Sequence, residues 1–150
     1  MVKLNLPDFS YNLKKDEGKI FIFDVIRKKF IVLTPEEWVR QHFVNYLIEH
    51  LKYPKSLIKI ESGLKYNSLQ KRTDIVIYNR DGKPWMVIEC KAFDQTLDHQ
   101  TIRQISTYNH TLQANFITIT NGLNHLSFEI NWKDNRTSFI EKMPEFPQTP

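Results

Sequence analysis

The sequence has a single cysteine, Cys90, and no long run of apolar residues. One cysteine excludes an internal disulfide framework and fits a reducing compartment. No apolar run exceeds five residues, whereas a helix that crosses a bilayer needs about 20. The first residues show no basic-then-apolar signal pattern. These absences predict a cytoplasmic protein that does not associate with a membrane.

Several motifs of other enzyme and metal-binding classes are also missing. The five histidines are scattered, and no cysteines accompany them at zinc-ligand spacing. The sequence has no G-x-x-x-x-G-K-[ST] phosphate loop and no G-x-S-x-G nucleophile turn. We therefore expect no structural zinc, no ATP-driven motor within these residues and no serine-hydrolase chemistry.

The composition is that of one ordinary globular domain. Of the 150 residues, 41% are hydrophobic and 25% are charged, and the net charge is +4, so residues 1–150 should form a single domain with a real core. Between Lys52 and Lys91, nine basic residues face four acidic ones. This local excess favours a polyanionic partner.

Hydrophobic periodicity predicts an α/β fold. Residues 1–18 look like an irregular lead-in, and residues 20–24 and 30–33 look like a hairpin around a basic turn. Thr34 followed by Pro35 and two glutamates is typical of a helix start, and that helix should run to about Leu51. We place the core at about residues 20–130 and expect a loose tail over 133–150.

The middle of the chain adds strands at 57–60, 74–78 and 85–90, with Asp81-Gly82 as a hairpin turn between the last two. A helix over about 96–112 and strands at 116–120 and 125–130 follow. From the first helix onward the order is αβββαβ. This order predicts a mixed central sheet flanked by helices.

Three residues around this hairpin could form a metal site. Alternate residues of a strand share a face, so Glu89 and Lys91 should point to one side and Cys90 to the other. Asp74 lies about seven residues before the turn and Glu89 about seven after it, so the hairpin should bring them together. Carboxylates with open coordination positions suit Mg²⁺, or Mn²⁺, which can activate a water beside a phosphate.

Asp74, fourteen further residues and Glu89-Cys90-Lys91 resemble the D-x(n)-E-x-K signature of PD-(D/E)XK nucleases, whose restriction-endonuclease-like core also has αβββαβ order. The motifs PEEWVRQ, KRTDIV, DGKP, ECKA and TNG occur in order around it. As a set they resemble the N-terminal nuclease domain of type I restriction enzyme R subunits, in the version that also occurs as a short stand-alone protein. The resemblance covers roughly residues 20–130.

The resemblance implies roles for particular residues. Asp74, Glu89 and the backbone carbonyl of Cys90 would bind the metal, and Lys91 would assist the attacking water. A glutamate of the first helix would complete the site, and we choose Glu37 while leaving Glu36 open. The resemblance also implies nucleic-acid contacts by Gln104 and Tyr108 of a Gln-x-x-x-Tyr motif, and position and charge suggest the same for Lys71 and Arg72.

These residues also have ordinary structural interpretations. Glu36 and Glu37 suit the first turn of any helix, Gln104 and Tyr108 could belong to a plain helix face, and the basic pair could be solvated. The function expected is a magnesium-dependent DNA nuclease of a restriction system, as a homodimer or with other subunits. The alternatives are a catalytically silent nucleic-acid-binding module and a protein-interaction domain. Substrate form, endo or exo cutting and sequence specificity stay open.

Overall fold

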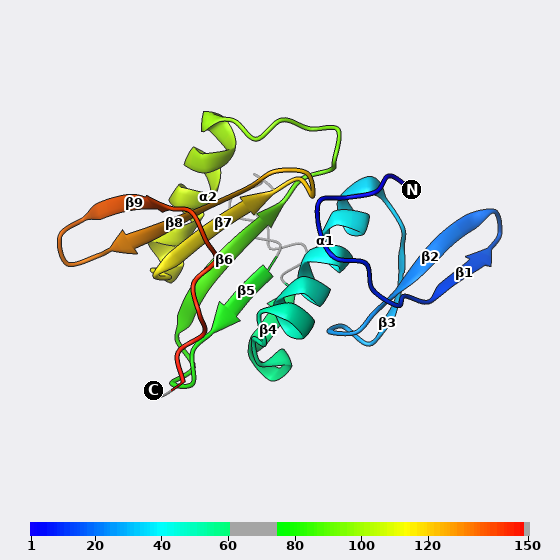
Figure 1. The fold of residues 1–150 in the computed structure, drawn as a ribbon, viewed down its shortest axis with the longest axis horizontal. Coiled ribbons are helices and arrows are strands. Elements are labelled where there is room, and N and C mark those ends of the chain that lie inside the picture. Colours follow the sequence, from blue (N-terminus) through cyan, green and yellow to red (C-terminus); the bar gives the residue numbers. More distant parts are fainter. Residues whose placement is uncertain (61–74, 149–150) are drawn as a thin grey trace.

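A computed structural model describes residues 1–60 and 75–148 of the chain. These residues form two sheets, one of three strands and one of six, with a helix packed on each face of the larger sheet (Figure 1). None of the helices in the described ranges is long and apolar enough to cross a bilayer.

The three-stranded sheet contains β1 (Leu13–Asp16), β2 (Lys19–Asp24) and β3 (Lys29–Val32), in that order and antiparallel. The predicted hairpin of β2 and β3 is confirmed. The expectation of a wholly irregular lead-in is wrong, because β1 pairs along β2. Every residue of β1 is exposed, so the segment lacks the alternating apolar pattern from which a strand could be predicted. Backbone hydrogen bonds and a turn at Gly18, with φ of 80°, form it instead.

The first helix, α1 (Pro35–Asn45), begins where the sequence predicts. Thr34 is its N-cap, and its hydroxyl accepts a hydrogen bond from the Glu37 N–H at 3.0 Å. A π-helical turn (Tyr46–His50) continues the helix to Leu51, which confirms the predicted length. A short 3-10 turn (Lys55–Leu57) then leads into the large sheet.

The six-stranded sheet has the order β4-β5-β6-β7-β8-β9, in which only the β6–β7 pair of these strands is parallel. Helix α2 (His99–Leu112) makes the crossover between β6 and β7. From α1 to β7 the elements follow the predicted αβββαβ order, so the mixed α/β sheet is confirmed. The strands are β4 (Ile58–Ile60), β5 (Ile75–Tyr78), β6 (Pro84–Cys90), β7 (Phe116–Thr120), β8 (His125–Asn131) and β9 (Arg136–Ile140).

The C-terminal segment is more ordered than expected. Residues 136–140 form β9 on the edge of the sheet, and Phe146 is buried against the rings of Tyr53 and Trp85. The Tyr53 hydroxyl also donates a hydrogen bond to the Pro144 carbonyl. The prediction of a loose tail over 133–150 is therefore wrong for this part, because one aromatic anchor fixes the chain on the core.

The two faces of the large sheet have separate cores. Met86, Ile88 and Cys90 of β6 pack in the cluster that includes α1. Val87 of the same strand packs in the cluster that includes Ile105 of α2. The alternation along β6 therefore determines which helix each side chain meets.

Candidate functional site

Glu89 and Lys91 lie together at the C-terminal end of β6. Lys91 Nζ is 3.5 Å from Glu89 Oε1, and the two side chains are 25% and 15% exposed. Cys90 is buried, at 1% exposure, in the cluster on the α1 face. The predicted alternation is thus confirmed: the acid and the amine share the α2 face, and the thiol between them belongs to the core.

The neighbouring strand fixes the backbone of this end. Cys90 pairs with Thr120 in the parallel β6–β7 ladder, and the Lys91 N–H donates to the Thr120 carbonyl at 2.8 Å. The Asn121 amide donates to the Gln95 carbonyl at 2.7 Å, which ties down the segment after Lys91. The Thr-Asn-Gly motif therefore supports the strand end that carries the two charged groups.

Of the other residues predicted at the metal site and its basic flank, Asp74, Lys71 and Arg72 lie outside the described residues. The described part of β5 begins at Ile75, which pairs with Ile88. Within residues 1–60 and 75–148, no group of three or more His, Cys, Asp or Glu side chains is arranged to hold a metal ion. The described residues thus supply one carboxylate, one amine and the Cys90 backbone to the predicted site.

Asp98, the N-cap of α2, lies near this pair and was not identified from the sequence. Hydrogen bonds from the Thr101 N–H at 2.9 Å and the Thr101 hydroxyl lower the pKa of Asp98, and the charge of Lys91 lowers that pKa further. The start of α2 therefore lies within electrostatic range of the Lys91 amine. Its sequence signal was Asp98 with Thr101 three residues later, which moves the helix start from the predicted Thr96 to His99.

The two residues of the Gln-x-x-x-Tyr motif have different environments. Gln104 is exposed, whereas Tyr108 is 6% exposed and belongs to the buried stripe of α2. Four residues correspond to a rotation of about 40° around a helix, so Gln104 lies at the border of that stripe. The structure therefore does not expose both side chains on one surface.

Glu37 lies in a buried network of charged groups between α1 and β2. Its Oε1 accepts hydrogen bonds from Arg40 at 2.7 Å and from Arg27 at 3.0 Å. Its Oε2 accepts from Gln41 at 3.0 Å and from Arg27 at 3.1 Å. Both oxygens are thus engaged, and a guanidinium would have to move before Glu37 could bind a cation. Glu36, the alternative, is a third exposed and bonds to Arg40 at 2.8 Å.

Asp24 of β2 is the second acid in this network and is fully buried. Burial tends to raise the pKa of Asp24, but hydrogen bonds from the Arg27 backbone and from the Gln41 and Arg27 side chains outweigh it, so the pKa is lowered. Asp24 Oδ2 accepts from Arg27 Nε at 2.7 Å and from Gln41 at 2.9 Å. The network fastens the three-stranded sheet to the first turns of α1.

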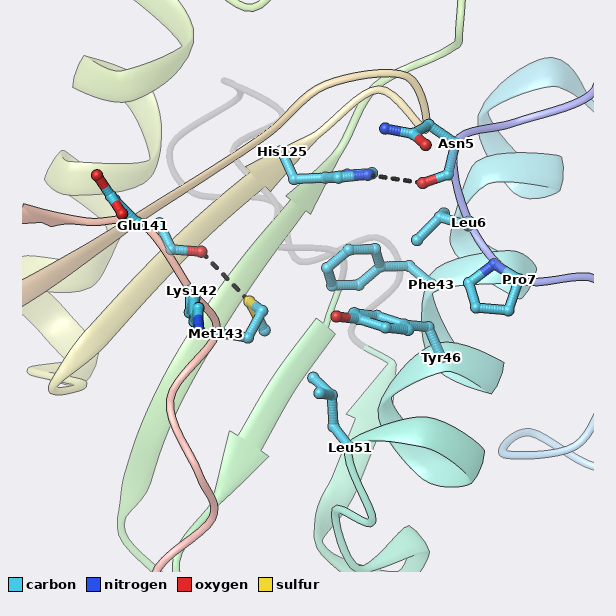
Figure 2. Close-up of a pocket in the computed structure, with 11 residues that line it drawn as sticks. Asn5, Leu6, Pro7, Phe43, Tyr46, Leu51, His125, Glu141, Lys142 and Met143 are labelled. Carbon is cyan, nitrogen blue, oxygen red and sulfur yellow. Dashed lines mark hydrogen bonds between the residues drawn. The ribbon is translucent and has the colours of Figure 1, made fainter.

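A cavity of about 430 Å³ lies on the α1 face, on the other side of the large sheet from Glu89 and Lys91. Phe43 of α1 and Tyr46 of the π-helical turn line one wall, and Met143 of the C-terminal segment lines the other (Figure 2). His125 links the wall of this cavity to the N-terminal segment, because the His125 Nε2 forms a hydrogen bond with the Asn5 carbonyl at 3.1 Å. This cavity is therefore separate from the predicted site.

The architecture defines a mixed α/β domain with an acid and an amine at the end of one central strand. Residues 35–144 match the family of the type I restriction enzyme R protein N terminus, and the chain belongs to this family. A solved fragment described as an HsdR subunit of a type I restriction enzyme from Vibrio vulnificus YJ016 has a similar fold, with a TM-score of 0.53 and 22% sequence identity. The match covers 75% of this chain and 24% of that one. No curated protein matches the chain.

Proposed function

We propose that this domain is a magnesium- or manganese-dependent DNA nuclease with a PD-(D/E)XK site. The observation that carries the proposal is the pairing of Glu89 and Lys91 on one face of β6, 3.5 Å apart and partly open to solvent. Ile88, next to Glu89, pairs with Ile75, which follows Asp74 in the chain. The proposal assigns the second carboxylate of the site to Asp74.

The donor set fits a hard divalent cation. Asp74 and Glu89 would supply carboxylate oxygens and Cys90 its backbone carbonyl, which are the oxygen ligands that Mg²⁺ prefers. When bound, such an ion polarises a phosphate and lowers the pKa of a coordinated water. Glu89 is 15% exposed, so part of its carboxylate is in contact with solvent.

Lys91 has the position of the group that would orient a water and stabilise negative charge on the phosphate. The charge of Lys91 lowers the pKa of Asp98, so the two groups interact electrostatically. We do not assign Glu37 to the reacting atoms. Its carboxylate is held by Arg27, Arg40 and Gln41, and we assign it the role of fastening the three-stranded sheet to α1.

The DNA substrate and the restriction setting rest on the family. The chain spans about a quarter of the length of the solved HsdR fragment that it matches, so partner subunits that translocate DNA, or a second copy of this chain, are part of the proposal. In this proposal Lys71 and Arg72 would contact phosphates, and the exposed Gln104 of α2 would also contact the DNA. The buried position of Tyr108 suits packing under that surface.

Cleavage of plasmid DNA in Mn²⁺ or Mg²⁺ tests the proposal. We expect wild type to cut and both Asp74→Ala and Lys91→Ala to lose cutting by at least about a hundredfold, the usual effect of removing a positioned catalytic group. Lys83→Ala, an exposed lysine in the β5–β6 turn, is the matched control and should cut normally. Wild-type DNA binding without any cutting, or full activity of Lys91→Ala, would overturn it.

A further inference from the structure

The three-stranded sheet has one packed face and one open face. On the packed face, Ile22 is fully buried with α1 in the core, and Asp24 accepts a hydrogen bond from Gln41 of α1. The strand pairings place the remaining alternate residues on the other side, where all are exposed or half-buried. We call this surface the open face; it consists of Lys14, Asp16, Lys19, Phe21, Phe23, Phe30 and Val32.

Aromatic rings and lysines are interleaved on the open face. The Phe23 and Phe30 rings meet edge to face, with centroids 5.3 Å apart. Lys14 Nζ lies 4.6 Å from the centroid of Phe30 and 5.7 Å from that of Phe21. Phe30 and Val32 are 36% and 41% exposed. A folded chain rarely leaves such apolar area in water without a use.

The charge around the open face identifies the kind of partner. Lys14 and Lys19 lie on the open face and are exposed. Lys15 and Lys29 are also exposed, but they pair with Ile20 and Asp24 on the opposite face of the sheet. Asp16 is the acid on this face. Protein interfaces are depleted in lysine, whereas surfaces for single-stranded nucleic acid combine aromatic rings with a cationic surround.

We propose that the open face binds single-stranded nucleic acid. Unpaired bases stack on the exposed parts of Phe30, Phe21 and Phe23, and Lys14 and Lys19 pair with the flanking phosphates. The face lies beyond α1 from the six-stranded sheet (Figure 1), so it is a second nucleic-acid contact, apart from Glu89 and Lys91. It deepens the proposed nuclease function, because it gives the domain a means to hold an unpaired stretch of its substrate.

Fluorescence anisotropy of labelled (dT)20 in EDTA tests this site without any cleavage. Phe30→Ala should weaken (dT)20 binding by roughly five- to a hundredfold, the usual effect of losing one stacking ring, and should leave binding of a duplex of equal length less affected. Phe139→Ala is the matched control: Phe139 is 59% exposed and meets Phe128 edge to face at 5.9 Å, yet it lies on β9. Lys14→Ala should reduce the slope of log K against log salt by about 0.7.

A second readout avoids any loss of stability in the alanine variants. Phe30→Trp keeps a ring on the open face, and its fluorescence should be quenched when (dT)20 is added, whereas Phe139→Trp should not respond. Equal binding by wild type and Phe30→Ala, or no (dT)20 binding at low salt, would overturn the proposal; the latter result would favour a protein partner on this face.

The test of (dT)20 binding does not depend on whether the protein cleaves DNA. Lys83→Ala should bind (dT)20 as wild type does, because Lys83 lies in the β5–β6 turn of the other sheet. Binding of (dT)20 by wild type without cleavage of plasmid DNA would count against the nuclease alone. Normal cleavage by Phe30→Ala with unchanged (dT)20 affinity would count against the open face alone.

Discussion

Lys91 Nζ lies 3.5 Å from Glu89 Oε1, on a strand end where the residue between them points into the opposite core. Such a partly exposed pair contributes little to stability by itself. Its importance is its position, because the backbone of the same strand end is held by the hydrogen bond from the Lys91 N–H to the Thr120 carbonyl. The relationship leads to a direct test of metal binding.

Divalent metal should stabilise the protein through Glu89. At a Mg²⁺ or Mn²⁺ concentration about a hundredfold above Kd, linkage predicts about 2.7 kcal/mol, which corresponds to a rise in Tm of roughly 5–10 °C for a domain of this size. Glu89→Gln should abolish the rise, because it removes a charged ligand, and Lys91→Ala should retain it. Differential scanning fluorimetry with and without metal measures both. An unchanged metal response in Glu89→Gln would contradict the assignment.

Glu37→Gln should strongly destabilise the fold. The substitution leaves the buried guanidinium of Arg40 and the half-buried one of Arg27 without their shared carboxylate. Breaking a buried ion pair from one side costs about 3–5 kcal/mol. Urea unfolding measures the loss. Glu36→Gln is the control, since Glu36 is a third exposed and should cost less than about 1 kcal/mol. A similar small cost at both positions would show that the network is not structural.

Stability should fall as the pH drops below about 6.5. Burial lowers the pKa of His42 and of His125 from 6.5, so the unfolded chain takes up protons that the folded chain resists. The stabilising contribution is therefore complete above about pH 6.5 and decreases as the pH falls through the folded values. Unfolding free energies at pH 7.5, 6.5 and 5.5 should show the decline.

Burial lowers the pKa of His125, and its hydrogen bond with the Asn5 carbonyl acts in the opposite direction. Thr120 Oγ1 lies 2.7 Å from His125 Nδ1 and accepts from the Gly122 N–H, and His125 Nε2 faces the Asn5 carbonyl at 3.1 Å. His125→Gln should therefore flatten part of the pH dependence, while the exposed His110→Gln should leave it unchanged. An equally steep decline in His125→Gln would exclude this residue as a source.

Two glycines with the same backbone angle provide a matched test of how the N-terminal segment packs. Gly82 and Gly122 have φ of 79° and 85°, so alanine adds a similar strain of about 1–2 kcal/mol at each. At Gly82 an added methyl meets nothing within 4 Å, whereas at Gly122 it lies 2.8 Å from the Leu4 side chain. Gly122→Ala should therefore lower the unfolding free energy more than Gly82→Ala. Equal losses of unfolding free energy in urea would show that the Leu4 side chain can move aside without destabilising the protein.

Much of the fold could be predicted from residues that are close together in the sequence. The Thr34 cap, the Pro35 start and the alternation of Glu89, Cys90 and Lys91 were predicted from neighbouring residues alone. Strand β1 was missed because its four residues are all exposed, and the tail was misjudged because one distant contact of Phe146 with Trp85 orders it. Hydrophobic patterns report burial, and neither segment has a pattern of its own.

The sequence by itself determined the α/β order and the spacing of two acids and a lysine about one hairpin, because periods of two and 3.6 residues are local properties of the backbone. Only the tertiary structure decided that Glu37 is held by Arg27 and Arg40, that Asp98 lies near Lys91, and that one face of the three-stranded sheet stays open. These outcomes depend on which surfaces pack against each other. Such contacts join residues far apart in the chain, and no local pattern encodes them.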